Sequence, residues 1–156
     1  MNSQTGGWLA LVALCGLLGS CGGSVDPGGP APGSAAVSVS VVDPSATSSQ
    51  AKFRLLALFA GGCPSDQDLA AGKLASAESI QKIPQLDASF NVSGLDVKKI
   101  AFVGMFRRDD CGVVAFGCTP ADLTVHKYVM VQVEPVTPPT GACASGVSCV
   151  DGQCAP

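Results

Sequence analysis

Apolar residues alternate with polar or small residues along most of the chain between residues 36 and 136. The segment AVSVSVVD (36–43) places three valines on one face of an extended strand and two serines on the other. The same period of two recurs in segments rich in β-branched or aromatic residues: 52–60, 86–92, 99–106 and 127–133. Clusters of Gly, Pro, Ser and Asp separate these segments, as is typical of turns. The pattern predicts an all-β fold, an antiparallel β-sandwich of about six to eight strands.

Three stretches between these strands have a less regular pattern. Ser65 followed by Asp68 is typical of a helix N-terminus, so a short helix is expected near residues 65–72. The following segment, 75–83, is compatible with a strand. Residues 111–123 have an apolar centre between two cysteines and resemble a strand, with Pro120 favouring an extended residue before it.

Composition limits the number of domains and the class of partner. A chain of 156 residues is long enough for one domain with one core and additional tails. Only 13% of residues are charged and the net charge is -3, while nucleic acids and anionic lipid surfaces are bound through clustered Lys and Arg. The adjacent basic pairs, Lys98 with Lys99 and Arg107 with Arg108, are interpreted as solvated strand residues. No nucleic-acid partner is expected.

The N-terminal segment is typical of an exported protein. Residues 8–18 form an apolar run of eleven, which fits the ~7 to 15 residues of a signal-peptide core and is shorter than the ~20 of a membrane-spanning helix. The residues LGSC (18–21) that follow resemble the lipobox of bacterial lipoproteins. This resemblance implies cleavage before Cys21, acylation of Cys21 (including palmitate) and attachment to a membrane. Gly22 in place of Asp implies sorting to the outer membrane, with the protein facing the periplasm or the cell surface.

Cys15 is a second lipobox candidate, but it follows the bulky Leu14. The alternatives to a lipoprotein are an ordinary secretory signal with a fortuitous cysteine and a buried N-terminal helix. After Cys21 the chain is rich in Gly, Pro and Ser, and this composition is typical of a flexible linker. The expected organisation is a signal peptide (1–20), a lipid anchor and linker (21–35), a β-sandwich (36–137) and a Cys-rich tail (138–156).

The second half of the chain carries a further resemblance. The succession FNVSGLDVKKIAFVGMFRRDDCGVVAFGCTPADLTVHKYVMVQVEPV (90–136) is similar to the second half of transthyretin-like and carboxypeptidase-regulatory-like β-sandwiches. The tail CASGVSCVDGQC (143–154) resembles the C-terminus of cysteine-containing bacterial surface lipoproteins of unknown function. These resemblances imply the sandwich fold and carry no catalytic motif onto this chain.

Eight cysteines are present, and six remain when Cys15 and Cys21 are set aside. An even number in an exported chain predicts disulfides, with these candidates: Cys63, Cys111, Cys118, Cys143, Cys149 and Cys154. Three lie in the body and three in the tail, so complete pairing requires an odd number of bridges between body and tail. The expected pairing is Cys111 with Cys118, Cys63 with a tail cysteine, and the other two tail cysteines together. Zinc is the alternative, but the closely spaced pairs typical of zinc sites are missing.

Residues suited to catalysis or metal binding are few. His126 is the single histidine and is interpreted as a surface strand residue. The acid pairs Asp66 with Asp68 and Asp109 with Asp110 are interpreted as turn and cap residues rather than calcium ligands. No metal, cofactor or catalytic residue is predicted.

Three function classes remain. The first is a noncatalytic binding or structural module of the cell envelope, with an envelope protein as a possible partner. The second is a carbohydrate-binding module, which lacks an obvious aromatic platform because Trp8 belongs to the signal and Tyr128 is the single tyrosine. The third is a hydrolase that uses His126.

Overall fold

The computed structural model describes residues 34–155. The predicted signal peptide, Cys21 and nearly all of the linker lie outside the described residues. The elements are β1 (Ser34–Val42), a 3-10 turn η1 (Thr47–Gln50), β2 (Phe53–Ala60), α1 (Asp66–Ala70), β3 (Ser79–Lys82), β4 (Ser89–Asp96), β5 (Lys99–Arg107), β6 (Val113–Asp122), β7 (Tyr128–Gln132), β8 (Glu134–Thr140), β9 (Ser148–Val150) and β10 (Gln153–Ala155).

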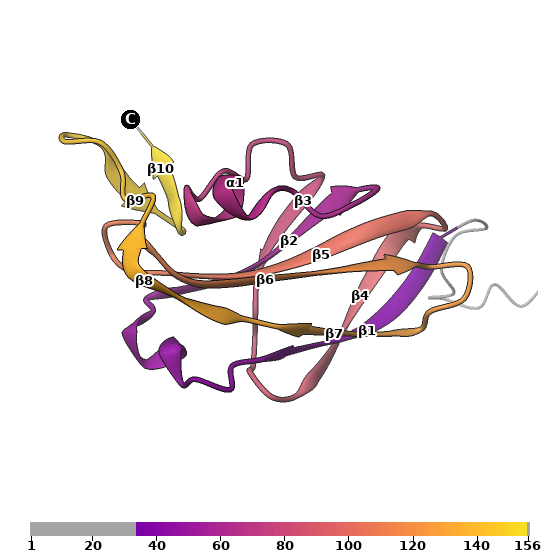
Figure 1. The fold of residues 1–156 in the computed structure, drawn as a ribbon. Helices are drawn as coiled ribbons and strands as arrows, with labels where there is room; N and C mark the ends of the chain where they lie inside the picture. The colour runs from indigo at the N-terminus through magenta and orange to yellow at the C-terminus, as the bar shows by residue number, and fades with distance from the viewer. Residues whose placement is uncertain (1–33, 156) are drawn as a thin grey trace, which may run out of the picture.

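Two sheets face each other and form a sandwich (Figure 1). One sheet has the strand order β4-β1-β7 and the other the order β3-β2-β5-β6-β8, which together make eight strands. The predicted all-β fold is confirmed. The strand pairs are antiparallel except for β1 and β7, which run parallel. The tail adds a separate hairpin of β9 and β10.

The alternation in the sequence correctly identifies the residues between the two sheets. Val37, Val39 and Val41 of β1 are buried there against Phe102 and Phe106 of β5. Burying each of these side chains contributes roughly 1.5–3 kcal/mol to the free energy of folding. The hydrophobic effect therefore fixes which face of β1 points inward.

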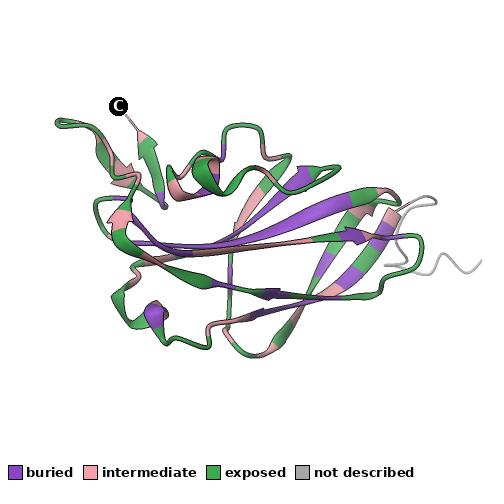
Figure 2. Ribbon diagram, viewed as in Figure 1, coloured by how far each residue is buried: buried purple, intermediate pink, exposed green. Residues whose placement is uncertain are grey.

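A second apolar cluster covers the outer face of the five-stranded sheet, where one core was expected from the sequence. Its members include Leu55, Ala57, Val103 and Met105 from β2 and β5 and Leu69 from α1. Strand β5 is consequently buried on both faces, as Figure 2 shows along its length. Helix α1 lies over this face (Figure 1), and its burial of Leu69 explains why the central strands are apolar on both sides.

The less regular stretches are also resolved. Helix α1 lies within the predicted 65–72 region, and the Ser65 hydroxyl accepts a hydrogen bond from the Asp68 amide at 3.2 Å as its N-cap. Strand β3 lies within 75–83 and pairs with β2 at the edge of the sheet. Residues 113–122 form β6, as their apolar pattern predicted.

The chain passes from one sheet to the other at Val133, between β7 and β8. At this corner Gly117 of β6 lies so close to β7 that a Cβ atom on Gly117 would be 1.8 Å from the carbonyl oxygen of Gln132. A side chain at position 117 would therefore force the two strands apart.

Strand β8 was not predicted. The expected boundary between the sandwich and the Cys-rich tail lies at Pro138, but β8 continues through Pro138 and Pro139 to Thr140. These prolines are compatible with a strand because β8 is at the edge of the sheet, where one side of the backbone needs no strand partner.

The two ends of the sandwich differ. Strand β1 enters at the end where Ser34 pairs with Asp96. Strand β2 begins at the opposite end, where Phe53 pairs with Arg107 at the end of β5. The tail hairpin also lies at this second end, far from the start of β1 (Figure 1).

Candidate functional site

The six predicted cysteines form three disulfides: Cys63–Cys118, Cys111–Cys149 and Cys143–Cys154. One bridge, Cys111–Cys149, joins body and tail, so the predicted odd number of such bridges is confirmed. Two of the three expected pairs are wrong, because Cys118 pairs with Cys63 and Cys111 pairs with a tail cysteine. The third expected pair, between two tail cysteines, is confirmed. Cys111 lies in the turn before β6 with a φ of 66°, whereas Cys118 lies within β6. The extended strand from Val113 to Cys118 alone spans roughly 17 Å, whereas a disulfide spans at most about 7 Å between Cα atoms.

The tail is ordered as a hairpin with a two-residue turn at Asp151 and Gly152. Both residues have positive φ, 50° and 77°, which is the conformation of a type I′ turn and explains the Asp-Gly dipeptide. Gly152 packs so closely on Phe53 and Leu55 of β2 that a Cβ atom would be 2.8 Å from the Leu55 side chain. The Asp-Gly pair between two short β-forming segments was the sequence signal for this hairpin.

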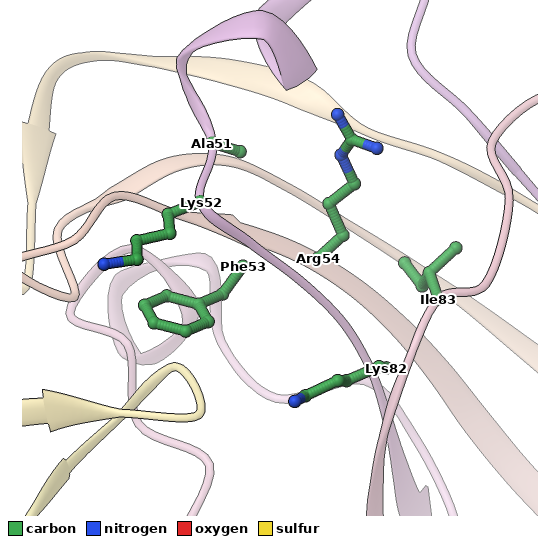
Figure 3. A pocket seen from close by; sticks show the side chains of 6 residues that line it. All are labelled: Ala51, Lys52, Phe53, Arg54, Lys82 and Ile83. Atoms are coloured by element: carbon green, nitrogen blue, oxygen red, sulfur yellow. The ribbon is translucent and has the colours of Figure 1, made fainter.

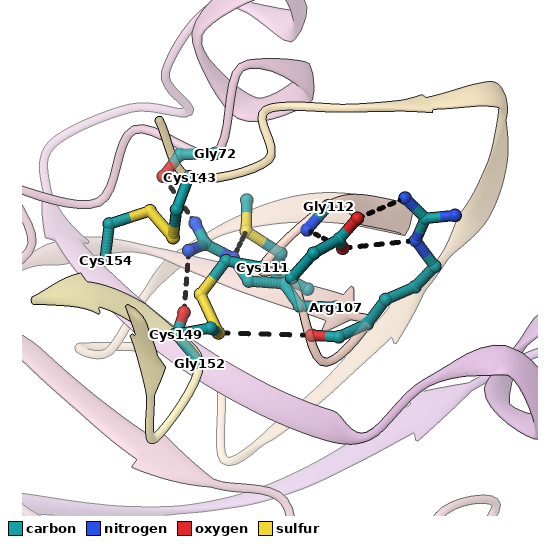
Figure 4. The surroundings of a disulfide bond; sticks show 11 residues. Gly72, Arg107, Cys111, Gly112, Cys143, Cys149, Gly152 and Cys154 are labelled. Atoms are coloured by element: carbon teal, nitrogen blue, oxygen red, sulfur yellow. Dashed lines mark hydrogen bonds and ion pairs between the residues drawn. A yellow bond between two sulfur atoms is a disulfide. The ribbon is translucent and has the colours of Figure 1, made fainter. Parts of the chain in front are cut away.

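A buried arginine holds the hairpin to the body. Arg107 is only 3% exposed, so its interpretation as a solvated strand residue is wrong. Its guanidinium donates to the carbonyl oxygen of Gly152 at 2.6 Å, to the carbonyl oxygen of Gly72 after α1, and to the sulfur of Met105 at 3.1 Å (Figure 4). Burial lowers the pKa of Arg107 below its ordinary value, although a guanidinium remains protonated in proteins.

No carboxylate among residues 34–155 forms an ion pair with Arg107. Its charge is instead stabilised by the backbone carbonyl groups of Gly72 and Gly152. Arg107 therefore connects three parts of the chain: β5, the loop after α1 and the hairpin turn.

A basic pocket of about 430 Å³ opens beside the hairpin, at the end of the sandwich where β2 begins. Its walls come from the start of β2 and the end of β3 (Figure 3) and consist of Ala51, Lys52, Phe53, Arg54, Lys82 and Ile83. The pocket holds three of the nine Lys and Arg residues of a chain whose net charge is -3. No pattern in the sequence indicated this pocket, because its residues from β2 and β3 meet only through strand pairing.

The basic side chains of the pocket have different neighbours. The ammonium of Lys52 is 5.7 Å from the centre of the Phe53 ring. Lys82 forms an ion pair of 2.8 Å with Asp151 of the hairpin turn. Arg54 donates to the carbonyl oxygen of Ser48 at 3.3 Å. Within the described part of the chain, neither Lys52 nor Arg54 forms an ion pair.

His126 lies exposed in the turn between β6 and β7. Its Nδ1 is 3.1 Å from the backbone carbonyl oxygen of Asp122. The carboxylate of Asp122 accepts hydrogen bonds from the hydroxyl and amide of Thr124, and these lower its pKa. His126 is thus part of a turn rather than a strand.

The acid pairs have local roles. Asp68 belongs to the first turn of α1 and pairs with Lys73 at 2.8 Å. Asp110 accepts a hydrogen bond from the Gly112 amide at 2.8 Å and pairs with Arg108. The amide of Gly112, with a further contribution from Arg108, lowers the pKa of Asp110. Both acids therefore stabilise local backbone turns.

Two of the disulfides are adjacent because Cys149 and Cys154 are direct cross-strand neighbours in the hairpin. The sulfur atoms of Cys111, Cys143 and Cys154 lie within 4.8 Å of one another. All three are in disulfides (Figure 4), whereas zinc is bound by thiolates.

Comparison with known proteins adds no relative to this description. No protein-family model matches the chain, and neither a curated protein nor a solved structure matches it. Among residues 34–155, no helix is long and apolar enough to cross a membrane.

The bridge between body and tail can be tested by removing it. Replacing Cys111 and Cys149 together by serine is expected to lower the free energy of unfolding by about 2–4 kcal/mol, because the Cys111–Cys149 bridge closes a long loop. The expected decrease in Tm is about 10 °C, measured by calorimetry. The tail should also become sensitive to a nonspecific protease. A variant with Cys143 and Cys154 replaced keeps the bridge between body and tail and is the control. Equal cleavage of the tail in both variants would show that the Cys111–Cys149 bridge does not hold the tail to the body.

Proposed function

We propose that this chain is a lipid-anchored protein of the cell envelope whose β-sandwich is a noncatalytic binding module. The observation that supports the proposal is the placement of the two ends of the sandwich. The linker from Cys21 would enter at Ser34, while the basic pocket and the hairpin lie at the opposite end. A lipid on Cys21 would therefore be attached through the end of the sandwich that lies opposite the pocket.

The way in which the tail hairpin is held to the body supports a binding role. Two disulfides and the buried Arg107 fix a hairpin that has almost no apolar core of its own. The hairpin turn contacts Phe53 and Lys82, which are walls of the pocket. The fixed hairpin thus supports residues that line the pocket, and a site whose residues are held in advance has a lower ordering cost of binding.

A carbohydrate-binding module is the second candidate. Phe53 places an aromatic ring in the pocket, and aromatic rings commonly contact the apolar faces of sugars. No observation favours the hydrolase candidate, because the hydrogen-bond partner of the His126 ring within residues 34–155 is the backbone carbonyl oxygen of Asp122.

The anchor is tested first. Cys21→Ser is expected to abolish acylation and to move the protein from the membrane fraction to a soluble or unprocessed form, because stable attachment requires the acyl chains. Mass spectrometry of the wild-type N-terminus should find a lipidated Cys21, and fractionation should place the protein in the outer membrane. An unmodified Cys21, or recovery solely in the inner membrane, would contradict the respective part of the proposal.

The binding role is tested by capture. The full chain in neutral detergent, immobilised through its C-terminus, is exposed to envelope extract, and bound material is analysed for proteins and for saccharides. Material retained by the wild type but not by a variant with Lys52 and Lys82 both replaced by Gln supports the binding module. Equal retention by both proteins would exclude the pocket as the binding site.

A further inference from the structure

We infer that the two disulfides that involve the tail can exchange partners. A small thiol converts the pairs Cys111–Cys149 and Cys143–Cys154 into the pairs Cys111–Cys143 and Cys149–Cys154. The exchange uses sulfur atoms that the fold has already brought together at one end of the sandwich. It goes beyond the proposed binding function, because it concerns how the tail hairpin is held to the body.

The sulfur atoms of the two disulfides lie close together. Figure 4 shows the two bridges side by side. The Sγ atoms of Cys111, Cys143 and Cys154 are within 4.8 Å of one another, although Cys111 belongs to a different disulfide from the other two. Thiol–disulfide exchange proceeds by attack of a thiolate on a sulfur atom of an existing disulfide, so it requires such proximity. A thiolate at Cys143 is therefore close to the sulfur of the other bridge that it would attack.

The backbone is compatible with both new pairs. Cys149 and Cys154 are directly opposite each other in the β9–β10 hairpin. Opposite Cα atoms of an antiparallel pair are about 4.5–5.5 Å apart, which lies within the range of about 4.4–6.8 Å for a disulfide. The amide of Cys143 donates to the carbonyl oxygen of Asp110, the residue before Cys111, at 3.0 Å. This hydrogen bond holds the backbone of Cys143 beside that of Cys111, so their bridge requires no large movement of the chain.

Exposure determines where an external thiol enters. Cys111 is completely buried, whereas Cys154 is exposed, so a thiolate of low molecular weight attacks the sulfur of Cys154. The S–S bond between Cys143 and Cys154 breaks, and a mixed disulfide forms on Cys154. The electron pair of the broken bond leaves on Cys143, which becomes a thiolate.

Two further steps complete the exchange. The Cys143 thiolate attacks the sulfur of Cys111, forms the Cys111–Cys143 bond and releases Cys149 as a thiolate. Cys149 then attacks the mixed disulfide on Cys154, its cross-strand neighbour, and releases the small thiol. Each step breaks one S–S bond and forms another. The thiol is returned unchanged, and the protein is neither oxidised nor reduced.

The exchange changes what holds the hairpin to the body. In the structure, Cys149 of β9 is bonded directly to the body. After the exchange, the bridge to the body is at Cys143, before the hairpin begins, and the bridge from Cys149 to Cys154 lies within the hairpin. The hairpin is then held against the body only by noncovalent contacts, which include those of Gly152 with Arg107 and β2.

The experiment incubates the oxidised full chain in neutral detergent with reduced glutathione at a concentration below that of the protein. Samples are quenched with acid, free thiols are blocked, and the linked peptides are identified by nonreducing mass spectrometry with fragmentation. The two new bridges are expected to appear together. Because the thiol acts as a catalyst, a tenfold increase in glutathione should raise the initial rate about tenfold and leave the final ratio of the two pairings unchanged.

Cys149→Ser is a variant in which the exchange starts without an external thiol. The substitution leaves Cys111 as a free thiol beside the Cys143–Cys154 bridge. Bridges from Cys111 to Cys143 or Cys154 should therefore form in this variant when no glutathione is added. The same mass-spectrometric mapping detects them.

Cys63→Ser is the matched control, because it also leaves one free thiol, that of Cys118 in β6. Cys118 does not belong to the group of sulfur atoms within 4.8 Å of one another, so both disulfides that involve the tail should be unchanged in this control. Three outcomes would overturn the inference: glutathione produces no new bridge, Cys149→Ser retains its original tail bridge alone, or the Cys63–Cys118 bridge of the wild type exchanges as fast as the other two. The last result would show that exchange follows general unfolding. None of the three bears on the anchor or on the capture of a ligand.

Discussion

Arg107→Ala is expected to lower the free energy of unfolding by about 3–5 kcal/mol, the largest effect of any single side-chain truncation proposed for this protein. The substitution removes charged hydrogen bonds to the carbonyl groups of Gly72 and Gly152, each worth about 1.5–3 kcal/mol. It also leaves a void in a site where Arg107 is almost completely buried. Chemical denaturation with unchanged disulfides is the measurement.

Arg108→Ala is the matched control for this prediction. Arg108 is the next residue, but its side chain is 41% exposed and pairs with Asp110, so its loss should cost less than about 1 kcal/mol. Arg107→Lys should give an intermediate value, since one ammonium cannot reproduce the guanidinium fork. If Arg107→Ala and Arg108→Ala were equally stable, the role assigned to Arg107 would be wrong.

Gly117→Ala is expected to destabilise the sandwich by about 3 kcal/mol. The added Cβ would be 1.8 Å from the Gln132 oxygen and 2.7 Å from the carbonyl carbon. Both are backbone atoms of β7, so they cannot move aside as a flexible side chain would, and overpacking of this kind commonly costs about 1–3 kcal/mol or more. Thermal unfolding followed by circular dichroism should show a clear decrease in Tm.

Gly62→Ala provides the comparison for Gly117→Ala. A Cβ on Gly62 would meet no atom within 4 Å, so its effect on stability should stay within about 0.5 kcal/mol. A Gly117→Ala variant as stable as Gly62→Ala would show that the close approach of β6 and β7 is not required for the fold.

The sequence predicts the strands well where a single rule determines them. Val37, Val39 and Val41 alternate with serines, and the hydrophobic effect alone places them inside. Ser65 and Asp68 likewise correctly predict the start of α1, because the Ser65 side chain caps the helix. Local chemistry and tertiary structure agree at these positions, so the expectation from the sequence is correct.

The pairing of the cysteines could not be predicted in this way. Parity requires a bridge between body and tail whatever the fold, but the choice of Cys111 depends on its place in the turn before β6, away from Cys118 in the middle of that strand. Arg107 was misread for a related reason. A charged residue at a strand end is normally solvated, and only the hairpin that folds over it makes Arg107 a buried residue.

The candidate site was the least predictable part of the molecule. Lys52 and Lys82 are thirty residues apart in the sequence, and the antiparallel register of β2 and β3 brings them to one pocket. No short-range pattern in the sequence predicts that two residues so far apart line one pocket. The net charge of the whole chain even pointed away from it, because an average over all residues conceals a local excess.

The disulfide between Cys111 and Cys149 has a consequence for the maturation of the protein after synthesis. A newly synthesised chain in a reducing compartment has neither this bridge nor that between Cys143 and Cys154. The hairpin has almost no core to hold it in place without them, so Asp151 would not yet be positioned beside Lys82. The position of the hairpin beside the pocket is therefore a property that the chain acquires by oxidation, and recombinant protein made in a reducing cytosol would have the sandwich without the fixed tail hairpin.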